Sequence, residues 1–429
     1  MNSNEIYVSL DIGTSTTKVI IGEMTNDSLN IIGVGNVESE GIRKGSIVDI
    51  DETVQSIKRA IIQAERMIGM NIKQVIVGIS GNHVALQPCH GIVAVSSDNR
   101  EITNEDVGRV LDAAQVVSIP PDREIINVIP KQFIVDGLDE ITDPRGMIGV
   151  RLEIEGTIIT GSKTILHNTL RCVERAGLEI SDIFLQPLAA GTIALSKDEK
   201  QMGTALIDIG GGSTSVAIFE HGYLKESFVL PVGGVHITKD LSVGLRTSTE
   251  SAEDIKKQYG HAFYDDASQD EIFSVPIIGS DQHEQFNQLE LSDIIEARLE
   301  ELFELVLHEL RKRGIEDLPG GIVLTGGTSN LPGILELAQY TFNNRVRIAI
   351  PDYIGVREPQ FITSVGLIKY AFKHARLQGR NINTTLTPQE SNESRQSFKQ
   401  EAKVNTKPSK REEDKVSSKM KKIFGLFFE

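Results

Sequence analysis

With 429 residues, of which 39% are hydrophobic, the chain has enough apolar material for two or more folded domains. It contains no apolar run near the roughly 20 residues that cross a bilayer and no secretion signal at its N-terminus, so we expect it to stay in the cytoplasm. The net charge is −16; residues 380–429 hold 11 basic and 7 acidic side chains, so the body, at −20, repels nucleic acid, whereas the basic tail attracts anionic lipid.

The N-terminal part of the chain predicts one half of an α/β fold. Residues 5–37 alternate β-rich runs with short polar turns, which is typical of a three-stranded meander. The elements that follow are a helix over 51–67 with Asp51 as its N-cap, a strand over 74–80, a helix over 163–176, a strand over 180–185 and a helix from Pro187. We assign residues 1–82 and 164–196 to this first half.

Residues 83–163 interrupt the first half and predict a small inserted module. This segment is rich in strand-forming residues and has one helical pattern, over residues 104–114. Prolines at positions 120, 121 and 130 indicate breaks between its elements.

A second meander begins at Gly203 and repeats the layout of the first, including an Asp-Ile-Gly turn. Helical patterns over 248–258 and 291–312 flank a loop-rich stretch, and a buried strand, GIVLTGG, leads into a helix near Gly333. We assign residues 197–219 and 299–377 to a second half and 220–298 to a subdomain within it. The predicted fold class is α/β, with two similar halves.

Two glycine-rich turns predict a phosphate site between the halves. Asp11 ends a buried strand before IGTSTTK, and Asp208 ends another before IGGGSTS. Such turns expose backbone N–H groups and hydroxyls to an anion, and the two aspartates can hold Mg²⁺ through its waters. The candidate phosphate contacts are Gly13, Thr14, Ser15, Thr16, Lys18, Gly210, Gly211, Gly212, Ser213 and Thr214. Either turn alone fits an ordinary Asp-capped β-turn equally well, but the pair is more specific.

A third glycine turn strengthens the prediction of a nucleotide site. The stretch VLTGGTSNLPG is a strand, a glycine turn and a helix start, the geometry that places a nucleotide against a helix N-terminus. Its candidate contacts are Gly326, Gly327, Thr328 and Ser329.

With these three motifs, residues 7–372 resemble the superfamily of actin and the sugar kinases. The resemblance implies an actin-like fold that binds ATP and Mg²⁺. It places Glu253 and Lys256, with Lys257 as a weaker candidate, beside the adenosine; the alternative is that they form a solvated helix face. It also places Gln186 where superfamily members orient the attacking water. Because glutamine is no strong general base, we expect at most slow hydrolysis, with ATP acting mainly as a conformational ligand.

The tail predicts a membrane anchor. Residues 378–414 are almost free of apolar side chains, which predicts a disordered linker, and residues 415–429 have the pattern of an amphipathic helix in a membrane interface. The candidate lipid contacts are Met420, Lys421, Lys422, Ile423, Phe424, Leu426, Phe427 and Phe428. The alternative is a helix that docks into a groove of this protein or of a partner.

The order of these parts, together with the stretch VESEGIRKGSIVDIDETVQSIKRAIIQAERMIGMNIKQVIVGISG, is similar to the FtsA family of bacterial cell division proteins. The resemblance implies a protein that forms filaments with itself on the cytoplasmic face of the membrane at the division site. It implies that residues 220–298 bind the C-terminal peptide of FtsZ, with Arg298 as a contact, and that residues 83–163 contact neighbouring subunits and later division proteins. The alternative for Arg298 is pairing with a Glu on its own helix.

Other classes of actin-fold protein fit less well. A small-molecule kinase needs neither the polar linker nor the lipid-seeking tail, and the residues after position 372 are too polar for a chaperone's substrate domain. A pilus-assembly ATP binder of similar fold is the nearest alternative, and the tail argues against it.

Overall fold

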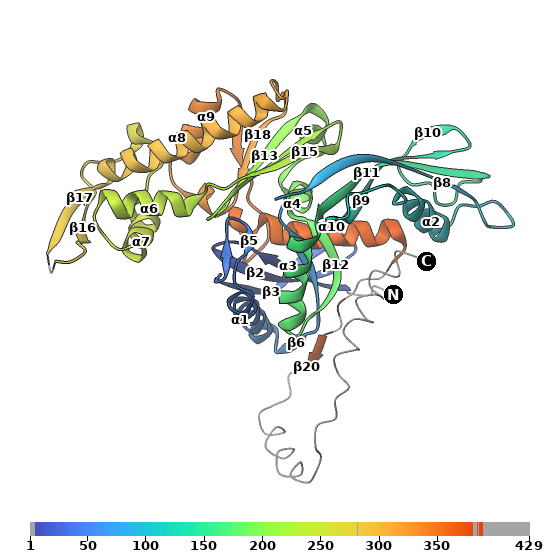
Figure 1. Ribbon diagram of the computed structural model, residues 1–429, viewed down its shortest axis with the longest axis horizontal. Coiled ribbons are helices and arrows are strands. Elements are labelled where there is room, and N and C mark those ends of the chain that lie inside the picture. The colour runs from blue at the N-terminus through green and yellow to red at the C-terminus, as the bar shows by residue number, and fades with distance from the viewer. Residues whose placement is uncertain (1–4, 281, 381–383, 385, 389–429) are drawn as a thin grey trace, which may run out of the picture.

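Two five-stranded sheets of the same construction form the centre of the computed structural model, which describes residues 5–280, 282–380, 384 and 386–388 (Figure 1). The strand orders are β12-β7-β1-β2-β3 and β19-β18-β13-β14-β15, each an antiparallel meander extended by two parallel strands. Their bounds are β1 (Glu5–Ile12), β2 (Thr16–Thr25), β3 (Ser28–Glu38), β7 (Gln74–Ile79) and β12 (Glu179–Leu185), then β13 (Thr204–Ile209), β14 (Thr214–Glu220), β15 (Tyr223–Leu230), β18 (Gly321–Thr325) and β19 (Val346–Ile348). The predicted duplication and both meanders are confirmed.

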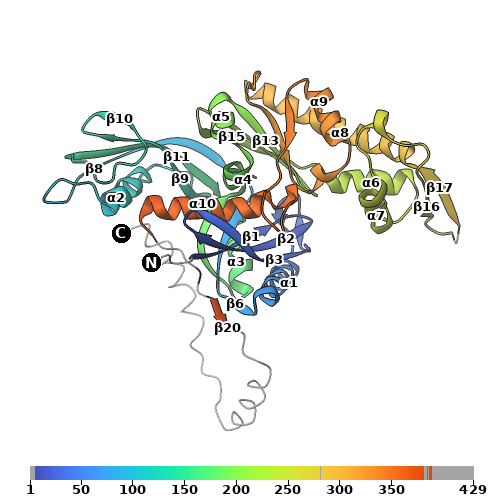
Figure 2. The same ribbon diagram turned by 180° about the vertical axis from the view of Figure 1, so that it is seen from behind.

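The two halves meet through a pair of central helices, seen from behind in Figure 2. α4 (Gln186–Ala194) follows the last strand of the first sheet, and α10 (Ile362–Gln378) follows the last strand of the second. The helices pack together, and a Cβ on Gly366 of α10 would collide with the carbonyl group of Ala189 in α4. Only glycine allows this close approach of the two backbones.

The remaining helices of the halves cover the sheets. They are α1 (Ile50–Ile68), α3 (Lys163–Arg175), α5 (Lys197–Met202) and α9 (Ile334–Phe342). The N-cap prediction for α1 was wrong: the cap is Asp49, whose side chain accepts the N–H of Glu52 at 3.0 Å. Asp51 already lies in the first helical turn, where an acidic residue favours the helix dipole without capping it.

The inserted module is a four-stranded sheet, β10-β9-β11-β8, with one helix against it (Figure 1). Its elements are β8 (Ala85–Ala94), α2 (Asn104–Ala114), β9 (Arg123–Val135), β10 (Leu138–Ile141) and β11 (Arg151–Ser162). α2 has the predicted bounds. Pro130 was predicted to be a break but lies inside β9, because the pairing of β9 with β11 shifts register beside it and so accommodates a residue without an N–H.

A second insertion separates β15 from β18. It consists of α6 (Gly234–Gly244), α7 (Thr249–Tyr259), the hairpin β16 (Ile272–Pro276) and β17 (His283–Asn287), and α8 (Gln288–Lys312). The stretch between α7 and α8 was predicted to be loop-rich, and the hairpin corrects this prediction. Phe273 and Val275 of β16 are buried, but the apolar Ile272 at the start of the strand is exposed and no residue of β17 is buried, so the sequence lacks a clear alternating pattern.

The chain after α10 returns to the first half. β20 (Leu386–Pro388) pairs with β6 (Met70–Ile72), and the backbone N–H of Thr384 donates to the carbonyl of Ile6 at 2.7 Å. These residues fall in the predicted disordered linker, so that prediction was wrong at its start. The predicted amphipathic helix, residues 415–429, lies outside the described residues. Among the residues that are described, no helix has the length and apolar character to span a bilayer.

We expect Gly366→Ala to lower the free energy of unfolding by about 1–3 kcal/mol, because the added methyl group would push α10 away from α4. Gly108→Ala in α2 is the matched control. Nothing lies within 4 Å of its added Cβ, so helix propensity should leave it neutral or stabilised by up to about 1 kcal/mol. Urea unfolding measures both variants, and equal stability of Gly366→Ala and the wild type would contradict this close packing.

Candidate functional site

The two motif aspartates occupy the same position in the two sheets. Asp11 of β1 pairs with Lys18 of β2, and Asp208 of β13 pairs with Ser215 of β14. Asp11 is 5% exposed, and Asp208 is partly buried. The two carboxyl groups lie close enough to interact electrostatically, so the structure brings the predicted metal residues together between the halves.

The N-termini of the two central helices hold these aspartates. Asp11 accepts hydrogen bonds from the amide of Gln186, the first residue of α4, at 2.6 Å and from the hydroxyl of Ser364 at 3.0 Å. Asp208 accepts one from the hydroxyl of Thr363 at 3.1 Å. Sequence reasoning missed Thr363 and Ser364; the available signal was a pair of hydroxyl residues in the first turn of a helix, where carboxylates are favoured neighbours.

The charge of the site is unbalanced. Burial raises the pKa of Asp208 to about 6, the neighbouring Asp11 raises it as well, and Lys18 and Thr363 act in the opposite direction. The Lys18 ammonium lies 3.9 Å from Asp11 and is the cation that partly offsets the pair. Two neighbouring carboxylates, one buried and one partly buried, with a single lysine beside them suit a further cation.

Mg²⁺ fits this pair of carboxylates. The described part of the chain contains no cluster of three or more His, Cys, Asp or Glu side chains that could hold a metal directly. Mg²⁺ commonly binds one or two carboxylates and keeps its other ligands as water or phosphate oxygens. Asp11 and Asp208 therefore match the chemistry of that ion.

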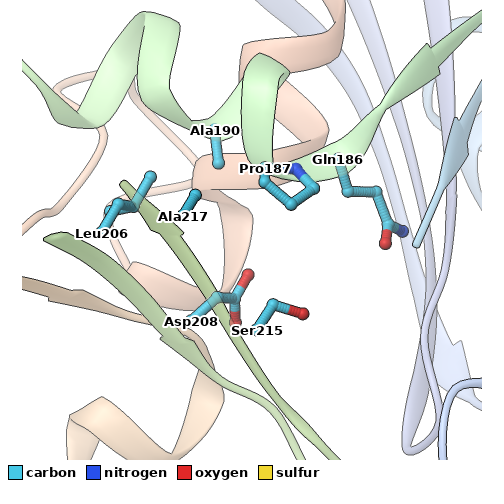
Figure 3. A pocket seen from close by; sticks show the side chains of 7 residues that line it. All are labelled: Gln186, Pro187, Ala190, Leu206, Asp208, Ser215 and Ala217. Atoms are coloured by element: carbon cyan, nitrogen blue, oxygen red, sulfur yellow. The ribbon is translucent and has the colours of Figure 1, made fainter. Parts of the chain in front are cut away.

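A cavity of about 20 Å³ lies beside Asp208 (Figure 3). Its polar lining is Gln186, Asp208 and Ser215, and its apolar lining is Pro187, Ala190, Leu206 and Ala217. This volume accommodates about one water molecule, and three polar side chains are enough to hydrogen-bond it. Gln186 thus lies at a place where a single water can sit next to the aspartate pair.

The two predicted phosphate turns face one another. Each turn has the same internal bond, from the N–H of Gly13 to the carbonyl of Thr16 at 3.1 Å and from that of Gly210 to the carbonyl of Ser213 at 3.0 Å. A Cβ on Gly211 would collide with Ser15, and one on Gly212 would collide with Thr14, so the tips are in contact. The glycines are needed for this approach, and glycine-rich turns of this kind are a common source of backbone N–H donors for anions.

The third glycine turn lies against the second phosphate turn. Gly326 has φ of 91°, and a Cβ there would collide with the Asp208 carboxylate. The Thr328 hydroxyl donates to the carbonyl of Gly210 at 3.3 Å, and Ser329 is buried. A short 3-10 helix, Gly327–Asn330, precedes α9 at this point. The three motifs therefore form one continuous surface around Asp208.

The candidate adenosine residues are also at this surface. Lys256 of α7 is 9% exposed, and its ammonium donates to the Glu253 carboxylate at 2.6 Å and to the carbonyl of Gly234 at 3.2 Å. Burial lowers the pKa of Lys256, and Glu253 opposes that shift. The alternative of a solvated helix face is wrong for Lys256, although Lys257 is exposed. Thr238, whose hydroxyl accepts from Lys256 at 2.8 Å, was missed because it lies on another helix.

Arg298 is engaged within the chain. Its guanidinium bonds both carboxylate oxygens of Asp240 in α6, at 2.5 and 3.1 Å, and also Glu301 on its own helix. The pairing with a Glu of the same helix is therefore present, and Asp240 adds a partner that the sequence did not indicate. The candidate lipid contacts, residues 420–428, lie outside the described residues.

Comparisons with known proteins identify the family. The model described as "Cell division protein FtsA" matches residues 205–366, and "SHS2 domain inserted in FTSA" matches residues 81–160. Cell division protein FtsA of Bacillus subtilis is 60% identical over the whole of both chains. The protein of the same name from Enterococcus hirae is 45% identical and covers 86% of this chain and 84% of its own.

Solved structures of low sequence identity share the fold. The PilM-PilN type IV pilus biogenesis complex contains a chain with a TM-score of 0.58 and 17% identity, covering 84% of this chain and 97% of its own. MreB5 of Spiroplasma citri bound to ADP has a TM-score of 0.53 and 15% identity, covering 87% of this chain and 98% of its own. With these likenesses the expected actin-like fold is confirmed, and at such identities to the B. subtilis and E. hirae proteins the chain belongs to the FtsA family of cell division proteins.

Proposed function

We propose that the protein binds ATP and Mg²⁺ between its two halves, forms filaments on the membrane and tethers FtsZ there. Asp11 and Asp208, brought together between the two glycine turns, are the observation that carries the nucleotide part. Membership of the FtsA family supports the cell division part. A pilus-assembly role has much weaker support, because the PilM-PilN chain is only 17% identical and shares the fold alone.

In this proposal, different residues bind the phosphates and the adenosine of the nucleotide. The turns at Gly13–Thr16 and Gly210–Thr214 bind the phosphates through backbone N–H groups, with Lys18 as the nearby cation. Glu253 and Lys256 bind on the adenosine side, where Gly234 lies between the Lys256 ammonium and the Thr328 hydroxyl. Asp11 and Asp208 would hold Mg²⁺ through its waters, and the ion would neutralise phosphate charge. MreB5 of S. citri, which shares the fold, has been solved with ADP and with AMPPNP.

Hydrolysis is slow in this proposal. Gln186 orients a water but, as a neutral amide, does not remove its proton. Its amide also donates to Asp11, so one side chain lies beside both the proposed water and a carboxylate of the proposed metal site. The nucleotide then acts mainly by changing the relative stability of two arrangements of the halves.

The membrane and partner roles use other parts of the chain. Residues 415–429 anchor the protein to anionic lipid at the cytoplasmic face of the division site, and self-association multiplies this weak contact. The MamK double helical filament, whose chain has the same fold, supports self-association. Residues 220–298 bind the FtsZ C-terminal peptide, and the inserted module contacts later division proteins. If Arg298 is a contact, it must first leave Asp240.

We expect Mg²⁺-dependent ATP binding to weaken as the pH falls from about 7 to about 5. Because the pKa of Asp208 is raised to about 6, protons compete with Mg²⁺ below that pH, and the affinity should fall by up to about tenfold per pH unit. Fluorescence titration at several pH values measures it. ATP also gains a proton in this range, so Asp208→Asn is the control: it should bind weakly and show a shallower pH dependence. Parallel profiles would contradict the role of Asp208.

Replacement of Gln186 should separate binding from hydrolysis. Gln186→Ala removes the amide beside the water-sized cavity, so we expect the rate of phosphate release to fall by about tenfold or more, with ATP affinity changed far less. A phosphate-release assay at saturating ATP measures the first quantity and titration the second. Phosphate release at the wild-type rate would remove the assigned role.

Vesicle co-sedimentation tests the anchor and the tether together. We expect the full chain to pellet with anionic vesicles, less with neutral ones, and to carry FtsZ with it. A chain truncated after Asp414 should do neither, since it lacks the lysines and aromatic residues of the tail. Equal pelleting of the two chains would refute the anchor, and failure of FtsZ to pellet with membrane-bound full chain would refute the tether.

A further inference from the structure

A tight hairpin that carries two cationic residues, Arg43 and Lys44, lies at the edge of the proposed nucleotide site. It is formed by β4 (Ile42–Arg43) and β5 (Ser46–Ile47), with Lys44 and Gly45 as its two turn residues. Both have positive φ, 51° and 72°, as in the two-residue hairpins that favour Asn, Asp or Gly at the first turn position. A lysine at position 44 is therefore less favourable than glycine or asparagine, and it places a positive charge at the tip of the hairpin.

The base of the hairpin is fixed to the start of α1. The carbonyl of Gly41 accepts from the N–H groups of Val48 and Asp49, at 2.8 and 3.0 Å, and from the hydroxyl of Thr53 at 3.3 Å. Thr53 is fully buried, and Ile42 is 8% exposed. The hairpin therefore has a defined position relative to the first half.

The tip of the hairpin contacts both phosphate turns. The backbone N–H of Gly45 donates to the Thr14 hydroxyl at 3.1 Å, and a Cβ on Gly45 would lie 3.7 Å from the Ser213 hydroxyl. Gly45 thus lies where the two turns meet. The adenosine-side residues are elsewhere, against Gly234 and Thr328, so this hairpin is at the phosphate end of the site.

The cations of the hairpin have no acidic partner among the residues that the structure describes. Arg43 and Lys44 are exposed and form no ion pair there, and the preceding acid, Glu40, is paired with Arg59 at 3.3 Å. The body of the protein is strongly acidic. Exposed charges on a turn are often simply solvated. Here, however, the backbone of the same turn is bonded to the first phosphate turn, which holds the two cations near it.

We propose that Arg43 and Lys44 bind the terminal phosphate of a nucleoside triphosphate and so favour ATP over ADP. This inference rests on the proposed nucleotide site. The terminal phosphate adds negative charge that the diphosphate lacks, and cation–phosphate hydrogen bonds are among the strong ones. Since Gly45 is bonded to Thr14, the hairpin also links the presence of that phosphate to the start of α1.

The test is a comparison of ATP and ADP affinities, by equilibrium fluorescence titration with Mg²⁺. The double variant Arg43→Gln/Lys44→Asn removes both charges, and Asn suits the left-handed turn position, so the hairpin should keep its shape. We expect about tenfold weaker binding of ATP with ADP binding changed less than about twofold. Lys44→Arg, which keeps the charge, should retain most of the preference for ATP.

The control variant is Arg66→Gln/Lys73→Asn. It makes the same charge change on exposed side chains at the far end of α1 and before β7, away from the phosphate turns, so its preference for ATP should match the wild type. An unchanged ratio of affinities in the Arg43/Lys44 variant, or an equal loss for both nucleotides, would overturn the inference alone. Failure of the wild-type chain to bind either nucleotide would overturn the proposed nucleotide function, and the inference with it.

Discussion

Two carboxylates at the junction of the halves, Asp11 and Asp208, constrain the positions of the helices and turns around them. A buried charge without partners costs several kcal/mol, so each aspartate must be supplied with donors. Asp11 has Gln186, Ser364 and Lys18, and Asp208 has Thr363. These donors come from both halves and from the first turns of α4 and α10. The helices must therefore converge on the same point, which explains why their backbones touch.

The duplication is close in topology and unequal in chemistry. The position opposite Asp11 in the neighbouring strand is Lys18, whereas the equivalent position opposite Asp208 is Ser215. The first half thus contributes a cation beside its aspartate, whereas the second half contributes a neutral hydroxyl at the equivalent position. The insertions also differ, because the first half carries a β-rich module and the second carries three helices and a hairpin. The two halves therefore share one fold but carry different insertions on it.

Local sequence patterns were sufficient to predict most of the strands, helices and turns of the two halves. The meanders, α2 and the three glycine turns follow from alternation, capping and glycine content, and each appears in the structure. The donors Thr363 and Ser364 could not be found this way, because they lie 155 and 353 positions from the aspartates they bind. The same reason hid Asp240 from the prediction for Arg298. The strand β20 was missed because composition over a long polar stretch outweighs the few residues, such as Leu386, that pack.

The pairing of β20 with β6 decides where a mechanical load enters the protein. Tension applied to the chain beyond Pro388 acts first on the short β20–β6 ladder and on the bond between Thr384 and Ile6. The force then passes into the first sheet through β6, which precedes β7 directly, and through β1. α10 is bypassed, so the hydroxyl contacts at its start are shielded from strain on the tail. The force reaches the end of α10 only after the β20–β6 hydrogen bonds have broken.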